Sequence, residues 1–506
     1  MIKKFDSAVG LTVIALSVSI LASPVAASKS ENAASENAQI GRPFTPCRLS
    51  DPLKLQSIEA ECAEITVPES DIAGAKRITL SVARIPAINR KKQVDPIVLL
   101  AGGPGQGAQL TFTTVSLVFS RAGRERDILL LDQRGTGNSN PLSCATEART
   151  VGEALAFDTP TFVKMTERCL ERLSVSNDLG AYTTSRAVRD LEAVRELLGY
   201  EKLNLYAGSY GTRVAQHYAR RYSTRVRSMV LDGVVAPQSI LGPRISLDAQ
   251  AALDGIWRRC SADKSCREQF GDMRAKTEAL QARLKRSPEA VQMPNPRTGA
   301  VESFTFGSEQ LAAVLRFGSY DPGFAAMLPL VVSEAIRGNF RPASTLFLLT
   351  AASVQEMLAF GMHNSVVCSE DVPRFSEAGV DRDAVSKTYL GTGFLDALPE
   401  ICKKWPKGLV DSGFHEPLVS DIPTLLLSGS LDPVTPPADA KQVAQGLKNS
   451  KHLVFEGAAH GQISIPCMDR VLAGFFSSAD PKGLNTQCLE RRIQPPFWLS
   501  LSGPAP

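Results

Sequence analysis

The stretch Leu203-Asn-Leu-Tyr-Ala-Gly-Ser-Tyr-Gly-Thr212 joins an apolar, strand-like run to a helix-like segment over residues 214–222. The junction is the tight turn around Ser209. A serine between a strand and a helix is typical of a nucleophile elbow, a strained turn that exposes the hydroxyl group. Such a turn needs small neighbours, and Ala207 stands where the G-x-S-x-G pattern has its first glycine. The pattern makes Ser209 a candidate nucleophile; a serine in an ordinary glycine turn is the alternative.

Short apolar runs on both sides of this stretch have the length and composition of strands buried on both faces of a parallel sheet. They cover residues 96–100, 127–131, 203–206, 228–231, 424–428 and 452–455, after two strand-like segments at 64–67 and 78–84. Apolar residues at helical spacing run from Ala187 to Leu198, with Thr184 or Ser185 as the N-cap and Gly199 as the stop. Alternating strands and helices predict an α/β fold with a mostly parallel sheet.

The strand rhythm stops after Gly233 and resumes near Asp421, and the residues between are rich in helix formers. This predicts an inserted, mainly helical cap. The full chain of 506 residues is long enough to bury a large core. We expect a signal peptide at 1–27, a flexible leader at 28–46, the first part of the core at 47–237, the cap at 238–415, and the second part of the core at 416–506.

The first residues have the features of an export signal. Lys3 and Lys4 precede an apolar run at residues 8–22, and a small-residue site ends at Ala27. An uncleaved membrane anchor is the alternative. We expect an exported protein, periplasmic or extracellular, with no stable membrane insertion after signal removal. The net charge of +4 comes from 56 basic and 52 acidic residues and gives no support to a nucleic-acid partner. Ten cysteines fit disulfides in an oxidising compartment.

A serine nucleophile needs a base, and the base needs an orienting carboxylate. Among five histidines, His460 lies in the loop Gly457-Ala-Ala-His-Gly461, directly after an expected strand. Asp432 also follows a strand, in a turn fixed by Pro433; an ordinary Asp-Pro turn is the alternative. The chain order serine, aspartate, histidine is that of α/β-hydrolases and not that of chymotrypsin or subtilisin. The sequence therefore predicts the α/β-hydrolase fold.

Acyl transfer also needs backbone donors for the oxyanion. We expect them from Tyr210, after the nucleophile, and from Gly102 and Gly103 in the loop Ala101-Gly-Gly-Pro-Gly-Gln-Gly107. That loop lacks the spacing of a phosphate cradle. The cysteines form no C-x-x-C pairs and the histidines no cluster, so we expect no metal and no cofactor.

Several motifs resemble the secreted tripeptidyl aminopeptidase and prolyl aminopeptidase branch of the α/β-hydrolases. They are Leu100-Ala-Gly-Gly-Pro-Gly, Asp132-Gln-Arg-Gly-Thr-Gly-Asn-Ser139, Ala207-Gly-Ser-Tyr-Gly-Thr212, Leu231-Asp-Gly-Val234, Gly429-Ser-Leu-Asp-Pro-Val-Thr-Pro436 and Gly457-Ala-Ala-His460. The resemblance implies a serine exopeptidase that frees one or a few residues from peptide N-termini. Two departures stand out. Ala101 replaces the histidine usual in prolyl aminopeptidases, and Ala207 replaces the first elbow glycine.

By the same family analogy, Glu370 and Asp371 are candidates to bind the free amine of the substrate. Solvated surface acids are the alternative. An esterase or amidase on the same scaffold is the close rival, and a catalytically silent binding protein is the remote one. Nearest-neighbour pairing of the cysteines predicts five disulfides: Cys47–Cys62, Cys144–Cys169, Cys260–Cys266, Cys368–Cys402 and Cys467–Cys488.

Overall fold

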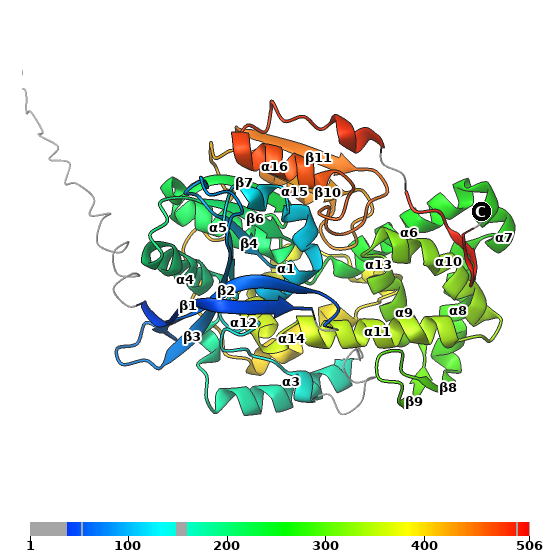
Figure 1. Cartoon of the computed structure of the whole chain (residues 1–506). Coiled ribbons are helices and arrows are strands. Elements are labelled where there is room, and N and C mark those ends of the chain that lie inside the picture. Colours follow the sequence, from blue (N-terminus) through cyan, green and yellow to red (C-terminus); the bar gives the residue numbers. More distant parts are fainter. Residues whose placement is uncertain (1–37, 52–53, 148–158, 492–493, 505–506) are drawn as a thin grey trace, which may run out of the picture.

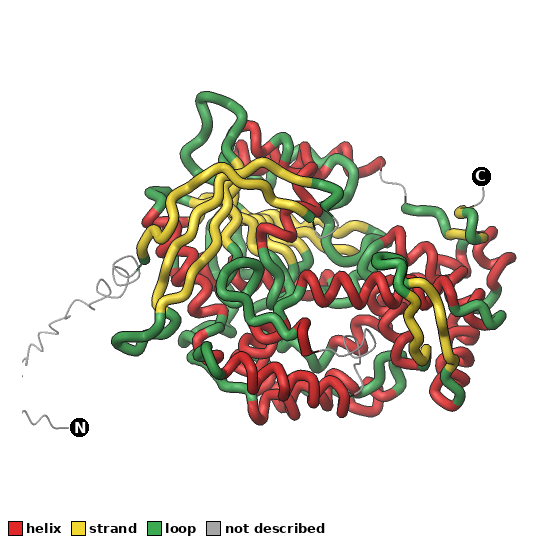
Figure 2. The backbone as a smooth tube through the Cα atoms, turned by 60° about the horizontal axis from the view of Figure 1, so that its bottom comes forward, coloured by secondary structure: helices red, strands yellow, loops and turns green. Residues whose placement is uncertain are grey.

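A twisted sheet of nine strands forms the centre of the molecule (Figures 1 and 2). The computed structural model describes residues 38–51, 54–147, 159–491 and 494–504; the expected signal peptide and residues 28–37 of the expected leader lie outside them. The order across the sheet is β1-β2-β3-β5-β4-β6-β7-β10-β11. The strands are β1 Gln39–Ser50, β2 Ser57–Pro68, β3 Arg77–Ile85, β4 Ile97–Leu100, β5 Ile128–Leu131, β6 Leu203–Gly208, β7 Val226–Asp232, β10 Thr424–Gly429 and β11 Ser450–Phe455.

The sheet is antiparallel at one end and parallel over the rest. β1, β2, β3 and β5 pair antiparallel, and every pairing from β5 to β11 is parallel. Neighbouring residues of the parallel strands enter two different hydrophobic clusters, such as Leu129 on one face and Leu130 on the other. This alternation explains why these strands are continuous apolar runs: helices cover both faces, as an α/β sheet requires.

The helices of the core alternate with the parallel strands as expected, whereas those of the insertion follow one another with few strands between them. They are α1 Ala108–Val115, α3 Thr159–Ser174, α4 Thr184–Leu197, α5 Tyr210–Arg221, α6 Ile245–Ala262, α7 Lys264–Phe270, α8 Met273–Arg286, α9 Ser308–Gly318, α10 Pro322–Ile336, α11 Arg341–Met357, α12 Phe360–Glu370, α13 Arg382–Ser386, α14 Gly393–Lys404, α15 Pro437–Ala444 and α16 Met468–Ser478. The N-cap of α4 is Thr183, one residue before the expected pair, and its hydroxyl accepts a hydrogen bond from the Arg186 amide.

The inserted segment divides between two hydrophobic clusters. Helices α6 to α11 build a separate cluster, whereas α12 and α14 contribute buried residues such as Met362 and Ile401 to the core cluster on the sheet. The cap also contains a β-hairpin, β8 Glu289–Pro294 and β9 Val301–Phe306, that helical periodicity did not predict. Only part of the insertion is therefore a separate cap.

Both ends of the described chain depart from the expected boundaries. Strand β1 begins at Gln39, so residues 39–46 belong to the sheet and not to a flexible leader. Their prolines resemble a loop but are tolerated in an edge strand, which needs fewer backbone donors. At the other end, Phe497 and Trp498 join the cap cluster, and the short strands β12 Trp498–Ser500 and β13 Gly503–Pro504 lie beside α7 and α10 (Figure 1). The last residues thus return to the cap.

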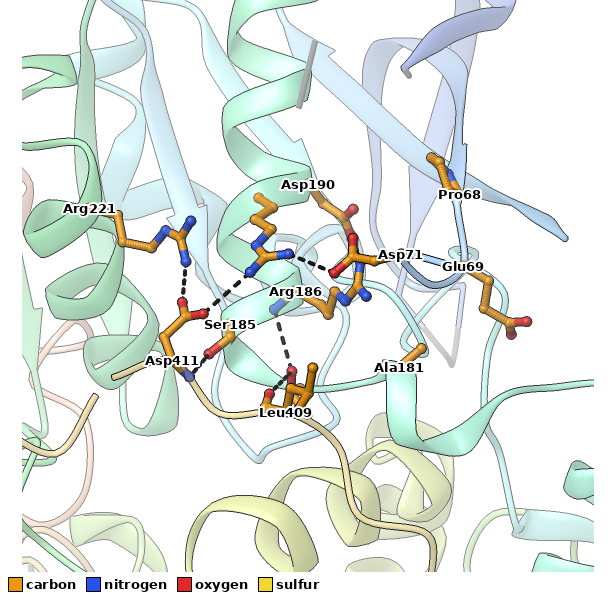
Figure 3. A network of polar contacts seen from close by, with 12 residues as sticks. Pro68, Glu69, Asp71, Ala181, Ser185, Arg186, Asp190, Arg221, Leu409 and Asp411 are labelled. Carbon is orange, nitrogen blue, oxygen red and sulfur yellow. Dashed lines mark hydrogen bonds and ion pairs between the residues drawn. The ribbon is translucent and has the colours of Figure 1, made fainter. Parts of the chain in front are cut away.

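A polar network ties the chain leaving the insertion to the core helices (Figure 3). The Asp411 carboxylate pairs with Arg221 of α5 and with Arg189 of α4, and its amide donates to the Ser185 hydroxyl (3.1 Å). His217 Nε2 lies 2.9 Å from the same carboxylate. This network fixes where the chain re-enters the core. Its contact with Asp411 gives His217 a structural role in this network.

Disulfides connect segments of the core and also segments of the cap. The structure forms the five pairs expected from the sequence, with one in the cap at Cys260–Cys266 and one between α12 and α14 at Cys368–Cys402. Within the described residues, no helix is long and apolar enough to cross a membrane.

Candidate active site

Ser209 occupies the turn between β6 and α5 in a left-handed backbone conformation, with φ 54° and ψ −126°. This conformation is costly for a residue with a side chain, and the surroundings must enforce it. The Ser209 amide donates to the Asp232 carbonyl (2.8 Å). Gly211 lets α5 lie directly against the end of β4, because a Cβ atom there would stand 2.3 Å from the Leu100 carbonyl oxygen. The sequence thus builds the expected elbow, with the serine at the start of a helix.

The candidate base and its carboxylate meet at the carboxyl ends of β10 and β11. His460 Nδ1 lies 2.8 Å from Asp432 Oδ2, an oxygen that also accepts the Thr435 hydroxyl (2.7 Å). The other Asp432 oxygen accepts the amides of Val434 and Thr435, both at 2.9 Å. An ionised carboxylate accepts from Nδ1–H, so the imidazole keeps Nε2 free to accept a proton. The two residues that the sequence predicted are therefore brought together.

Burial and charge act in opposite directions on His460. Burial lowers the pKa of His460, but the charge and hydrogen bond of Asp432, together with the charge of Asp232, outweigh it and raise that pKa above its ordinary value. Space for the ring is left by Gly233, where a Cβ atom would stand 3.1 Å from His460 Cε1. The imidazole is thus held in a polar pocket that favours its charged form.

Asp232, from the motif Leu231-Asp-Gly-Val234, is a second buried carboxylate at this point. Its two oxygens accept the Gln462 amide, each at 2.8 Å, and one accepts the Tyr206 hydroxyl (2.6 Å). Burial raises its pKa to about 6, against these hydrogen bonds. Through its backbone it holds Ser209, and through its side chain it holds the loop that carries His460. Asp232 is therefore a positioning residue between the two.

The expected oxyanion loop lies against the elbow. A Cβ atom on Gly102 would stand 3.0 Å from the Ser209 Cβ, so this backbone passes directly over the serine. Gly103 has φ 107°, which favours glycine. Tyr210 is the first residue of α5, and its amide has no acceptor within the helix. Gly102 and Tyr210 thus adjoin Ser209 and Gly103 follows in the same loop, so all three amides remain candidates for an oxyanion hole.

A cavity of about 570 Å³ opens above Ser209 and His460. The core contributes the Gly103–Pro104 loop, and the insertion contributes walls from α6, α9, α11, α12 and α14. Two carboxylates line it, Asp248 of α6 and Asp439 of α15. Burial raises the pKa of Asp439 to about 6, although the Ser239 hydroxyl donates to it (3.2 Å). The insertion is thus a lid that shapes the space above the serine.

Glu370 and Asp371, the residues expected to bind a substrate amine, lie elsewhere. Neither lines the cavity, and their side chains are buried. Asp371 forms a bidentate pair with Arg213 of α5 and accepts the Leu241 amide (2.9 Å). Glu370 accepts the Thr184 amide (2.7 Å) and hydroxyl (2.9 Å). Because protein donors already occupy both carboxylates, their surroundings do not support the expected role. Glu370 anchors the end of α12 to α4, and Asp371 anchors it to α5.

Sequence reasoning missed Thr435, Asp439 and Asp248 as neighbours of this site. Thr435 stands three residues after Asp432, where a hydroxyl can reach back to the carboxylate. That signal was readable from the sequence. No signal in the sequence pointed to Asp248 or Asp439. These residues stand 191 positions apart in the chain, and only the folded cap brings their side chains to one cavity.

Comparisons with known proteins agree with this geometry. The alpha/beta hydrolase fold family matches residues 95–255 of the chain, and the TAP-like protein family matches residues 387–488. The two matches cover the elbow on one side and the Asp432–His460 pair on the other. The chain has the α/β-hydrolase fold, and the site and relatives together define an enzyme of the serine hydrolase class.

Three relatives show the range of similarity. Serine protease Hip1 of Mycobacterium tuberculosis is 24% identical over 486 residues, which are 89% of this chain and 92% of that protein. The tripeptidyl aminopeptidase of Streptomyces lividans is 26% identical over 449 residues, covering 81% of this chain and 80% of that protein. Carboxylesterase B of Mycobacterium tuberculosis is 29% identical, but over only 41% of this chain and 43% of that protein.

Proposed function

We propose that this protein is an exported serine exopeptidase that removes one residue or a short peptide from the N-terminus of peptide substrates. The observation that carries the proposal is the cavity in which Ser209 and the Asp432-bound His460 face walls supplied by the insertion. The names of the two long relatives, a serine protease and a tripeptidyl aminopeptidase, favour peptides as substrates.

In the proposed mechanism, Ser209 attacks the scissile carbonyl while His460 Nε2 accepts its proton. Asp432 holds Nδ1 and stabilises the imidazolium that forms. The amides of Gly102 or Gly103 and of Tyr210 bind the developing oxyanion. His460 then gives its proton to the leaving amine, which departs, and water hydrolyses the acyl-enzyme by the same steps in reverse order.

An exopeptidase must also recognise a free amine, and the cavity offers Asp439 and Asp248 for this. Asp248 already pairs with Arg244 (3.2 Å), a residue whose side chain is 64% exposed. Asp439 has a hydroxyl neighbour and no ion pair among the described residues. An ammonium group entering the cavity would satisfy its charge. We therefore assign amine binding to Asp439 in place of Glu370 and Asp371.

The nucleophile is tested by Ser209→Ala and a fluorophosphonate probe. We expect turnover and labelling to disappear while the thermal melting curve stays that of the wild type. Undiminished labelling of the variant would remove Ser209 from the mechanism.

The substrate class is tested with aminoacyl, dipeptidyl and tripeptidyl anilides, each with a free and with an acetylated N-terminus, beside p-nitrophenyl esters. Exopeptidase function requires hydrolysis of the free-amine anilides and loss of activity on acetylation. Activity only on esters or on blocked substrates would favour the esterase or amidase alternative, to which the partial match with carboxylesterase B points.

Export is tested by mass spectrometry of the mature protein secreted from a host that carries the full gene. We expect an N-terminus at Ser28 and no free thiols, since all ten cysteines are paired. A protein that keeps residues 1–27 would support the anchor alternative.

A further inference from the structure

Two arginines of the insertion line the cavity, Arg244 and Arg316, and of these Arg244 has an exposed side chain and pairs with Asp248. Arg316 stands in the last turn of α9, lines the cavity together with Ser209 and His460, and is only 5% exposed. A buried guanidinium keeps its charge at any physiological pH. Its charge must therefore be balanced by neighbouring groups. The hydrogen-bonding positions that the protein leaves unfilled indicate which kind of ligand the site can bind.

The partners of Arg316 within the described residues are incomplete. Nη2 donates to the Tyr320 hydroxyl (3.1 Å), and the guanidinium stacks over the Phe394 ring, 5.1 Å from its centroid. Nη1 is buried without an acceptor, and no described carboxylate lies within ion-pair distance. The nearby Asp248 is paired with Arg244 instead. Leaving a buried donor or charge unsatisfied is unfavourable, and because Arg316 lines the cavity, a ligand bound there can supply the acceptor.

A second donor without a partner among the described residues lies in the cap cluster. The Tyr389 hydroxyl is buried with no hydrogen-bond partner among the described residues. Burial raises the pKa of Tyr389, and the nearby charge of Arg316 acts against that rise. Tyr389 therefore remains a neutral donor. Tyr389 is not among the residues that line the cavity, so the cavity presents the guanidinium of Arg316. A guanidinium offers donors in a planar fork and a positive charge, and a carboxylate matches both.

Tyr320 connects this arginine to the catalytic histidine. Its ring stands edge-on to the His460 ring, with centroids 5.3 Å apart and an interplanar angle of 72°. The His460 amide donates to the Tyr320 carbonyl (3.1 Å). In the proposed mechanism His460 protonates the leaving amine, so the leaving group lies on the histidine side of the cavity. Arg316 lies beyond Tyr320 on that side.

We propose that Arg316 binds a carboxylate on the leaving-group side of the peptide substrate. The carboxylate comes either from the C-terminus of a short peptide or from an acidic side chain next to the scissile bond. This inference rests on the proposed peptidase function. On this proposal the enzyme acts on short or acidic peptides. The cavity then recognises the leaving group of the substrate as well as its N-terminus.

The test compares kcat/KM on two matched pairs of free-amine peptides. The first pair differs only in a C-terminal carboxylate or carboxamide, and the second, amidated, pair in an aspartate or asparagine after the scissile bond. We expect the wild type to prefer the carboxylate in at least one pair by about 10- to 100-fold, the range of a hydrogen bond to a charged group. Arg316→Met should bring that ratio close to one.

Two further variants keep the result interpretable. Arg316→Lys retains the charge without the planar fork and should keep part of the preference. Arg337→Met removes a cation from the same cap at the surface, where Arg337 pairs with Glu334 and is 57% exposed, and should leave the ratio unchanged. The pair that responds identifies the source of the carboxylate. A wild type without preference in either pair, or an Arg316→Met that weakens all four peptides equally, would overturn the proposal.

Binding to Ser209→Ala separates this inference from the proposed function. Calorimetry with the same peptides on Ser209→Ala and on Ser209→Ala/Arg316→Met measures carboxylate recognition without turnover. If the wild type hydrolyses no peptide, the proposed function fails. A carboxylate preference that Arg316→Met abolishes in the binding assay would still support the arginine site, and its absence there would reject the site.

Discussion

Two sets of carboxylates lie near the elbow, and they differ in what surrounds them. Glu370 and Asp371 lie behind α5, buried and occupied by Arg213 and by Thr184. Asp432 and Asp439 line or border the cavity, one bound to His460 and one without an ion pair among the described residues. Carboxylates of one chemical type thus divide into structural anchors, held away from the cavity by protein donors, and candidate functional groups at the cavity.

The largest effect is expected on kcat when Asp432, the carboxylate beside His460, is replaced. Asp432→Asn should lower kcat by about 10⁴-fold, because an amide can neither fix the required tautomer of His460 nor stabilise its charged form. The free energy of unfolding should change little in comparison. Steady-state kinetics and a denaturant titration on the same preparation measure both, and a variant with near-normal kcat would exclude Asp432 as the orienting acid.

The next largest effect is expected on the stability of the protein when Asp371, one of the two structural carboxylates, is replaced. Asp371→Ala leaves the Arg213 guanidinium buried without its bidentate partner and should reduce the free energy of unfolding by about 3–5 kcal/mol. The double variant Asp371→Leu/Arg213→Met removes both charges and should recover part of that loss, because the buried Glu370 carboxylate, 3.9 Å from Arg213, then loses its cation. Denaturant unfolding measures the two free energies. An Asp371→Ala protein of normal stability whose KM for free-amine peptides rises would return Asp371 to substrate binding.

A smaller and selective effect is expected at Asp439. Asp439→Asn should lower kcat/KM for free-amine anilides by about 10- to 100-fold, the value of a charged hydrogen bond. Asp248→Asn is the matched control, since its carboxylate is already paired with Arg244. Kinetics on one anilide with each variant decide between them. Equal losses of kcat/KM in the two variants would indicate that the carboxylates of Asp439 and Asp248 both bind the substrate amine.

The smallest effect is a shift in the pH profile. His460 must be neutral to act as a base, so kcat/KM should rise as pH increases through its pKa and fall in acid. Because Asp432 and Asp232 raise that pKa against the effect of burial, the midpoint of the acid limb should lie above about 6.5, the value for a free histidine. In Asp232→Asn the limb should move to lower pH. A limb that does not move would exclude Asp232 as a neighbour that acts on the base.

Much of the core could be predicted from the sequence. The buried runs at residues 97–100, 128–131 and 424–429 are strands because apolar side chains on both faces fit only a covered parallel sheet. The elbow and the Asp432–His460 pair follow from residues that come directly after strands. The cap hairpin, the return of the C-terminus to the cap and the strand at residues 39–46 escaped prediction, because their partners are distant in the chain or because prolines resemble loops.

The sequence by itself determined the strand–turn–serine–helix junction, the order of the three candidate catalytic residues and the small residues that let the backbone approach Ser209. These depend on local geometry, which short segments encode. Only the tertiary structure decided which acids face the cavity, that Glu370 and Asp371 anchor a helix, and that Nη1 of Arg316 lacks an acceptor among the described residues. The reason is physical. Whether a charged group is available for a ligand depends on the donors and acceptors that folding brings to it from far along the chain.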